Sequence, residues 1–71
     1  MTIKVTIYPG GRVVEYVPKG RRGRVLVERL LKDLGYTPLT AVVVRGGAPL
    51  TEDDVIRDGD EVEIYEVRSA G

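Results

Sequence analysis

The chain contains no cysteine, no histidine, no tryptophan and no phenylalanine. The absence of cysteine excludes disulfides, a thiolate nucleophile and a zinc site of the usual kind. The acidic residues between Glu52 and Asp60 lack the spacing of a calcium-binding loop, so no metal site is expected. The side chains therefore offer no group suited to covalent chemistry, and the protein is predicted not to be an enzyme. The C-terminal carboxylate is therefore the remaining candidate for a reactive group.

A length of 71 residues predicts one domain with one small core and no room for an internal active-site cavity. No apolar run approaches the roughly 20 residues that a membrane helix needs. The first residues, Met1 to Val5, alternate between polar and apolar side chains, so no export or membrane-anchoring signal is expected. These features, with the missing cysteines, fit a small monomer in a reducing cytoplasm.

Charge is balanced overall but unevenly distributed along the chain. Residues 1–45 carry nine Lys or Arg against three acids, whereas residues 46–71 carry two Arg against eight acids. One interpretation is that the acidic C-terminal part steers the protein toward a basic partner surface. The other is ordinary solvated charge with surface ion pairs, and the sequence leaves both open.

Alternation at the N-terminus predicts a β-hairpin. Ile3, Val5 and Ile7 alternate with polar residues, which is the period of a strand with one buried face. Pro9-Gly10-Gly11 supplies a turn, because glycine adopts positive φ without a Cβ penalty. Arg12 to Val17 is then expected to form the second strand.

The period next changes to that of a helix. Four apolar residues recur at helical spacing: Val27, Leu30, Leu31 and Leu34. One amphipathic helix is therefore expected over residues 24–34. Gly35 provides the left-handed residue that ends such a helix, and Pro38 prevents its continuation.

The C-terminal part adds two strands and a short helix. The β-branched run from Ala41 to Arg45 predicts a strand. Thr51 to Asp54 carries a helix-capping pattern, so a short turn of helix is expected over residues 53–56. The turn Asp58-Gly59-Asp60 follows, and Glu61 to Val67 forms the last strand.

The order of these elements identifies the fold class as α+β. A right-handed crossover through the single helix places the last strand beside the first one and parallel to it. The result is a β-grasp fold, a mixed sheet of four to five strands around one main helix, in the order ββαβ(short helix)β. Residues 1–67 are expected to form this domain, and residues 68–71 a flexible tail that projects from its central strand.

Three stretches of the sequence resemble one protein family. They are the helix Val25 to Gly35, the strand and turn Ala41 to Gly47 and, above all, Asp58 to Ile64, which leads to a glycine terminus. On these residues the whole chain resembles the ubiquitin-like sulfur carriers, the ThiS and MoaD group. Relatives of that group include ubiquitin-related and archaeal small protein modifiers.

The resemblance implies a function for the last four residues, which are Arg68, Ser69, Ala70 and Gly71. In this family a partner adenylyltransferase of the ubiquitin-activating type uses ATP to adenylate the terminal carboxylate. Sulfide or persulfide from a donor then converts it to a thiocarboxylate for a downstream biosynthetic enzyme, or the carboxylate is joined to a protein lysine. The resemblance implies that Gly71 is the activated residue and that the carrier itself binds no cofactor.

The tail departs from the family at one position, because the family ends in Gly-Gly and this chain has Ala70 before Gly71. Glycines suit the tail because a residue without Cβ passes through a narrow channel and leaves the carbonyl open to attack. Three explanations stay open: the activating partner accepts alanine, a further glycine is missing from the sequence, or carrier function has been lost. A frayed terminus without function is also compatible with such small residues.

An activating enzyme must also recognise the body of the domain. If Val62 and Ile64 face the helix, Tyr65 and Val67 point to the outer face of the sheet, and Val43 is expected to join them there. Val43, Tyr65 and Val67 thus predict an apolar docking patch ringed by charge. The alternative is that tyrosine and valine simply favour strands, because isolated exposed apolar residues are common.

The basic segment from Lys19 to Arg24 suggests a different function. Its four cations could contact phosphates, and the spacing of Gly20 and Gly23 is similar to the nucleotide clamp of KH domains. A net charge of zero and the scarcity of aromatic residues argue against general RNA binding. The alternative function from another class is therefore a non-catalytic β-grasp interaction module of the TGS type, which binds RNA or a nucleotide through this segment.

Overall fold

The first and last strands lie side by side in the middle of one mixed sheet. The computed structural model describes residues 2–19 and 23–67. Strand β1 (Ile3–Tyr8) pairs antiparallel with β2 (Arg12–Tyr16), so the expected hairpin is confirmed. Strand β7 (Glu61–Glu66) lies on the other side of β1 and runs parallel to it, as expected for the last strand.

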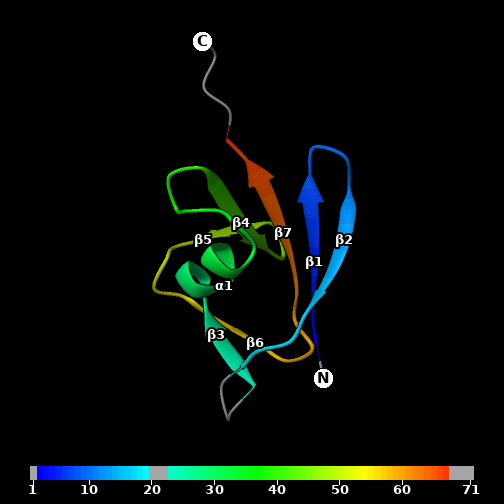
Figure 1. The fold of residues 1–71 in the computed structure, drawn as a ribbon, viewed down its shortest axis with the longest axis vertical. Coiled ribbons are helices and arrows are strands. Elements are labelled where there is room, and N and C mark those ends of the chain that lie inside the picture. Colours follow the sequence, from blue (N-terminus) through cyan, green and yellow to red (C-terminus); the bar gives the residue numbers. More distant parts are fainter. Residues whose placement is uncertain (1, 20–22, 68–71) are drawn as a thin grey trace.

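Two further strands complete the sheet. Strand β4 (Ala41–Arg45) pairs antiparallel with β7, and β5 (Ala48–Leu50) pairs antiparallel with β4. The order across the sheet is β2-β1-β7-β4-β5, as Figure 1 shows. A mixed five-stranded sheet with one helix is the α+β arrangement of a β-grasp fold, and β7 holds its central position.

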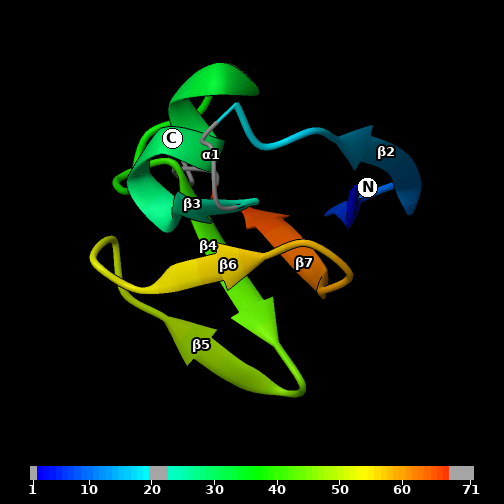
Figure 2. The same ribbon diagram turned by 90° about the horizontal axis from the view of Figure 1, so that it is seen from below.

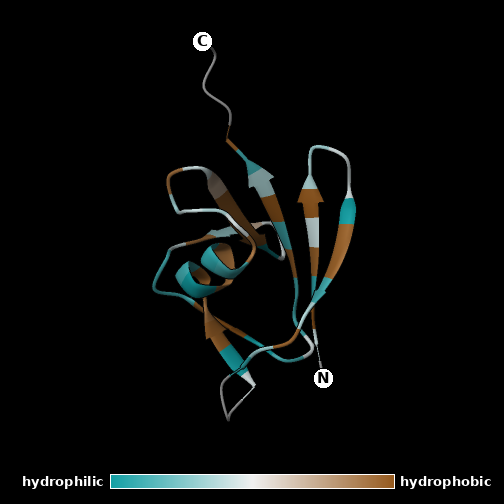
Figure 3. Cartoon of the chain, in the orientation of Figure 1, coloured by the Kyte–Doolittle hydropathy of each residue, from teal (hydrophilic) through white to brown (hydrophobic). Residues whose placement is uncertain are grey.

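One amphipathic helix, α1 (Val27–Asp33), packs against this sheet through Val27, Leu30 and Leu31. Hydrophilic residues occupy its outward side and hydrophobic residues its inward side, as Figure 3 shows. Gly35 has a φ of +89°, which is the left-handed conformation expected where the helix ends. In the described ranges no helix has the length and apolar character needed to cross a bilayer.

Helix α1 begins at Val27, whereas the sequence analysis predicts that it begins at Arg24. Residues Arg24–Leu26 form strand β3, which pairs antiparallel with β6 (Val55–Arg57) in a separate two-stranded sheet (Figure 2). Val25 and Ile56 are register partners in this pair, and both are buried. Burial of two β-branched side chains therefore favours a strand over a further turn of helix.

The prediction of a short helix over residues 53–56 is wrong, because a turn and strand β6 occupy this segment. The Asp54 carboxylate closes the turn by accepting a hydrogen bond of 2.7 Å from the Thr51 N–H. The carbonyls of Asp54 and Glu52 accept hydrogen bonds of 2.9 and 3.2 Å from the first two N–H groups of α1. These carbonyls accept hydrogen bonds from N–H groups that have no partner within α1. They are therefore not available as acceptors within a separate short helix over residues 53–56.

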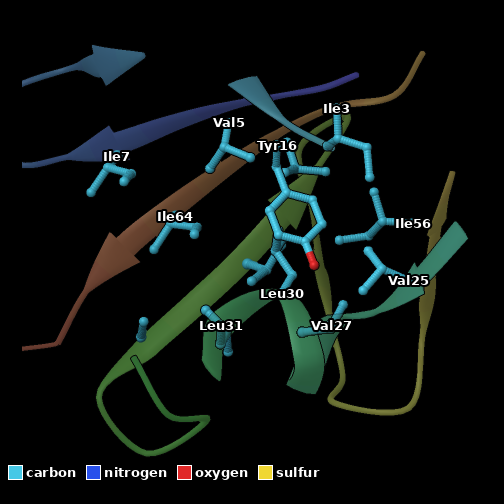
Figure 4. Close-up of a cluster of buried hydrophobic side chains, with 13 residues drawn as sticks. Ile3, Val5, Ile7, Tyr16, Val25, Val27, Leu30, Leu31, Ile56 and Ile64 are labelled. Atoms are coloured by element: carbon cyan, nitrogen blue, oxygen red, sulfur yellow. The ribbon is translucent and has the colours of Figure 1, made fainter. Parts of the chain in front are cut away.

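The core lies between the inner face of the sheet, α1 and the β3–β6 pair (Figure 4). Its most deeply buried side chains are all aliphatic: Ile3, Val5, Leu30, Leu31, Val43, Ile56, Val62 and Ile64. No polar or charged residue is buried within the described part of the chain. Aliphatic packing therefore supplies the stability that disulfides provide in many other small domains.

The turn Asp58-Gly59-Asp60 leads into β7, as expected. Its Asp60 carboxylate accepts hydrogen bonds from the Arg57 N–H at 2.9 Å and from Arg45 Nη1 at 3.1 Å. Arg45 Nη1 also donates a hydrogen bond of 2.9 Å to the Val55 carbonyl. The guanidinium of Arg45 thus joins β4 to β6 and fixes the turn from which the central strand starts.

Tyr16 ties the hairpin to the helix. Its ring belongs to the buried cluster, and its hydroxyl donates a hydrogen bond of 2.6 Å to Asp33 Oδ2 at the end of α1. Burial, followed by the hydrogen bond to Asp33 and the charge of that carboxylate, raises the pKa of Tyr16 to about 12. The same hydrogen bond lowers the pKa of Asp33. At neutral pH the phenol is therefore protonated and the carboxylate ionised, which suits the hydrogen bond.

We expect alkaline pH to destabilise the fold through Tyr16. Its pKa is raised from 10.0 to about 12, so its contribution is fully present below pH 10 and is lost as the pH rises to 12. Since one pKa unit corresponds to about 1.36 kcal/mol, this loss is on the order of 3 kcal/mol of unfolding free energy. Urea unfolding across this pH range should show a smaller loss in Tyr16→Phe than in the wild type. Equal losses would assign the effect to Tyr36 and Tyr65, whose pKa values are also raised and which both proteins contain.

Gly23 is a position at which a side chain should be strongly destabilising. Its φ is +62°, and an added Cβ would collide with the Asp58 carboxylate. The Gly23 carbonyl accepts a hydrogen bond of 2.7 Å from the Asp58 N–H, so the two backbones cannot separate freely. We expect Gly23→Ala to lower the unfolding free energy by about 2–4 kcal/mol, from left-handed strain and overpacking together. Urea unfolding should show a smaller loss in Gly46→Ala, where φ is a similar +60° but an added Cβ meets nothing within 4 Å, and equal losses would contradict the collision.

Candidate functional site

The pairing register defines an outer face of the sheet, turned away from α1. Ile7 and Ile64 are buried in the core, so the next residues along their strands, Tyr8 and Tyr65, point outward. Tyr8 and Tyr65 are partners across β1 and β7, and Tyr65 is also the partner of Val42 in β4. The register therefore brings Tyr8, Tyr65 and Val42 into one row across three strands.

The prediction that Val43 lies on the outer face is wrong. Val43 is 1% exposed and is the register partner of Ile64, so its side chain lies in the core. Its neighbour Val42, which is 38% exposed, takes the outer position. The apolar run from Ala41 to Val44 contains no alternation that would fix which residues face inward. The register with β7 decides this, and it is a property of the fold.

The row of Tyr8, Tyr65 and Val42 forms an apolar surface at the end of β7. Tyr65 and Val67 are exposed, by 42% and 54%. The rings of Tyr8 and Tyr65 stack, with centroids 5.1 Å apart and 15° between their planes. Partial burial, followed by the charge of Glu63, raises the pKa of Tyr65, so its phenol is neutral at physiological pH. Tyr8, Val42, Tyr65 and Val67 are called the outer patch below.

Two members of the outer patch, Tyr8 and Val42, are not among the residues that the sequence analysis singles out. The alternation of Ile3, Val5 and Ile7 already implies that Tyr8 faces outward. That signal predicts the direction of the side chain but not its neighbour. The contact between Tyr8 and Tyr65 depends on the parallel pairing of β1 with β7, which joins opposite ends of the sequence.

Carboxylates lie on the same face of the sheet, from Glu63 near the outer patch to Glu15 and Glu61 toward the end where β1 begins. Glu61 and Glu63 in β7 and Glu15 in β2 occupy outward positions of their strands. Lys4 is the register partner of both Glu15 and Glu61, and its ammonium group lies 3.7 Å from the Glu61 carboxylate. Glu15, Glu61 and Glu63 are called the acidic band below. An apolar patch beside an acidic band fits a partner surface that is apolar at its centre and basic at its edge.

The outer patch lies where β7 reaches the end of the described structure. The Val67 N–H donates a hydrogen bond of 2.9 Å to the Thr40 carbonyl, so the chain is still held beside β4 at this residue. The four residues of the predicted tail lie outside the described residues: Arg68, Ser69, Ala70 and Gly71. Tyr65 and Val67 of the outer patch therefore lie near the end of the described chain, where Figure 1 shows the end of β7.

The other residues considered from the sequence are found elsewhere. Lys19 follows β2 and Arg24 begins β3, where both are exposed, whereas Arg21 and Arg22 lie outside the described residues. The part of the chain that the structure describes contains no cluster of acidic residues able to hold a metal ion. Asp54 and Asp60 instead accept the hydrogen bonds that close the two turns described above.

Comparison with known proteins identifies a relative that covers most of the chain. The chain is 34% identical over 64 residues to the sulfur carrier protein TtuB of Thermus thermophilus. The similar region covers 84% of this chain and 98% of that protein, so it includes nearly the whole of the relative. No protein-family model matches the chain.

Proposed function

Because the chain belongs to the family of ubiquitin-like sulfur carrier proteins, we propose that it carries sulfur as a thiocarboxylate on Gly71. The observation that carries this proposal is the similarity to a sulfur carrier over 98% of that protein's length. The fold supports it, since the central strand β7 leads directly into the tail. In this function the protein is a carrier, and the catalytic groups belong to its partners.

The proposed chemistry takes place on the terminal carboxylate. An activating enzyme transfers AMP from ATP to this carboxylate, with release of pyrophosphate. Sulfide from a donor then attacks the carbonyl carbon, the bond to AMP breaks, and a thiocarboxylate remains. Gly71 leaves the carbonyl unhindered for this attack because it has no Cβ, while Ala70 adds one methyl group to the tail. The same acyl adenylate would also allow conjugation to a lysine amine.

We assign the recognition of the activating enzyme to the outer patch and the acidic band. The outer patch contains two stacked tyrosines, and buried aromatic residues contribute most of the binding energy in many interfaces. The acidic band favours approach to a basic surface and increases the rate of encounter. Both lie on the face from which the tail continues, so one enzyme can hold this face while the tail enters its active site.

The proposal is tested by intact-mass measurement after incubation with the activating enzyme, ATP and a sulfide donor. We expect the mass of the protein to rise by the difference between sulfur and oxygen, and the rise to require ATP. Alkylation of the product by iodoacetamide should add one adduct, since the protein has no cysteine that would react. An unchanged mass, with an enzyme that activates another carrier in the same assay, would count against the proposal.

A further inference from the structure

A groove lies far from the outer patch, between β3, α1 and the end of β2. Its volume is about 490 Å³, and it is lined in part by Lys19, Arg24, Leu26 and Arg29. In Figure 1, β3 lies near one end of the molecule and the end of β7 near the other. A partner held in this groove therefore leaves the outer patch and the start of the tail accessible.

The charge in the groove is positive. Lys19, Arg24 and Arg29 contribute three cations, and Asp33 is the one carboxylate among the lining residues. Asp33 already accepts the hydrogen bond from Tyr16 at 2.6 Å and pairs with Arg29 Nε at 3.3 Å. Arg24 and Lys19 are exposed, so their charges remain accessible to a ligand. The groove is therefore suited to a negatively charged ligand.

The groove also offers apolar surface beside its cations. Leu26 is 46% exposed at this site. A second hollow of about 450 Å³ is lined by Arg24, Val25, Leu26 and Val55, so Leu26 lines both hollows. An exposed leucine between two hollows offers an apolar contact that a partner can bury, with cations around it.

Capping of α1 does not account for a leucine at position 26. Leu26 is the N-cap residue of α1, with φ of −73° and ψ of 147°, and its side chain makes no capping hydrogen bond. Serine, threonine, aspartate and asparagine are the residues that stabilise this position. Two N–H groups of α1 are already bonded to the carbonyls of Asp54 and Glu52, so the start of the helix does not depend on a capping side chain at position 26. Leu26 is the register partner of Val55 in the β3–β6 pair, yet 46% of its surface stays exposed, and this apolar surface is what a partner could cover.

We propose that this groove binds an acidic segment of a partner protein, which places an apolar side chain on Leu26 and carboxylates beside Arg24 and Lys19. Nucleic acid has the right charge, but its bases bind best by stacking on exposed aromatic rings, whereas Leu26 is aliphatic and the ring of Tyr16 is buried. A second copy of this chain has the acidic band, but that band lies on a different face from the groove. Such copies would associate head to tail in an open chain instead of a closed dimer.

The groove and the outer patch would then serve different partners at the same time. The outer patch with its acidic band suits a basic surface, and the groove suits an acidic one. A carrier with both can remain attached to one protein through the groove while another acts on its tail. This binding does not depend on the proposed chemistry of Gly71, so either proposal can fail without the other.

The test uses fluorescence anisotropy with the full chain and a labelled peptide in which leucine is flanked on both sides by aspartate and glutamate. We expect salt-sensitive binding that weakens about tenfold or more in Leu26→Ser, because the buried apolar contact is lost. Urea unfolding should show that Leu26→Ser stays folded under the conditions of the binding assay, because serine is the better N-cap residue and offsets part of the lost contact with Val55. Loss of binding by a folded variant separates the groove from the fold.

Charge variants complete the test. Arg24→Glu should weaken binding several-fold and reduce its salt dependence, whereas Lys32→Glu, on an exposed part of α1 outside the groove, should not. The proposal would be overturned if the peptide did not bind, or if a peptide with serine in place of leucine bound equally well. It would also be overturned if Arg24→Glu and Lys32→Glu had equal effects. Tighter binding of an RNA oligonucleotide, with an affinity that Leu26→Ser does not change, would overturn it as well. Concentration-dependent self-association through Arg24 would also overturn it, in favour of a second copy.

Discussion

A variant that lacks Gly71 is expected to form no detectable thiocarboxylate while it folds as the wild type does. Removal of one residue shifts the terminal carboxylate by about 3.3–3.6 Å along an extended chain. A displacement of about 1 Å can already reduce a reaction rate by roughly a hundredfold, because the reacting atoms must be aligned. The deletion also moves the carboxylate onto Ala70, whose methyl group lies next to the carbonyl.

The fold of this variant should be unchanged because the residues of the core lie between Ile3 and Ile64. Circular dichroism and urea unfolding check the fold, and intact-mass measurement with ATP, activating enzyme and sulfide checks the reaction. The matched control is Ala70→Gly, which keeps the length of the tail and gives it the Gly-Gly end of the family. We expect this control to react at least as fast as the wild type. A deletion variant that reacts as fast as the wild type would show that the reaction does not require Gly71.

The second large effect is expected from Val42→Glu in the outer patch. The substitution places a charge beside the stacked Tyr8 and Tyr65, on the face that we assign to the activating enzyme. Residues at the centre of an interface typically contribute about 2–4 kcal/mol, which corresponds to roughly a 30- to 1,000-fold loss in kcat/KM for adenylation. Pyrophosphate release at varied carrier concentration measures this loss.

Val17→Glu is the matched control for Val42→Glu. Val17 is 60% exposed and follows β2 at the end of the sheet where β1 begins, away from the outer patch. Both substitutions replace an exposed valine with the same charge, so a general effect of added negative charge appears in both. Equal losses in the two variants would show that the activating enzyme does not recognise the outer patch. A loss confined to Val42→Glu supports it.

The sequence predicts those parts of the fold that depend on local patterns. Alternation through Ile3, Val5 and Ile7 predicts β1, and the helical spacing of Leu30 and Leu31 predicts the buried side of α1. Gly35 predicts the end of that helix because glycine readily adopts a positive φ, and its φ in the structure is positive. In each case the signal lies within a few residues, so no knowledge of distant partners is needed.

The features that the sequence does not predict depend on pairing between distant segments. Val25 lies within the range 24–34 predicted as helix, but it becomes part of a strand because its partner Ile56 lies across from it. The carbonyls of Glu52 and Asp54 bond to α1, which removes the helix that their capping pattern suggests. Val43 turns inward because of its register with Ile64. These contacts join residues far apart in the chain, and local propensity carries no information about them.

The central position of β7 has a consequence for synthesis on the ribosome. The hairpin β1–β2 and the strands β4–β5 each lack their neighbour in the sheet until Glu61–Glu66 has been made. The pairing of Lys4 with Glu61 spans nearly the whole described chain, so the nascent protein cannot close its sheet early. Translation therefore has to deliver the C-terminal strand before the domain can fold, and shorter nascent chains expose their aliphatic residues to chaperones.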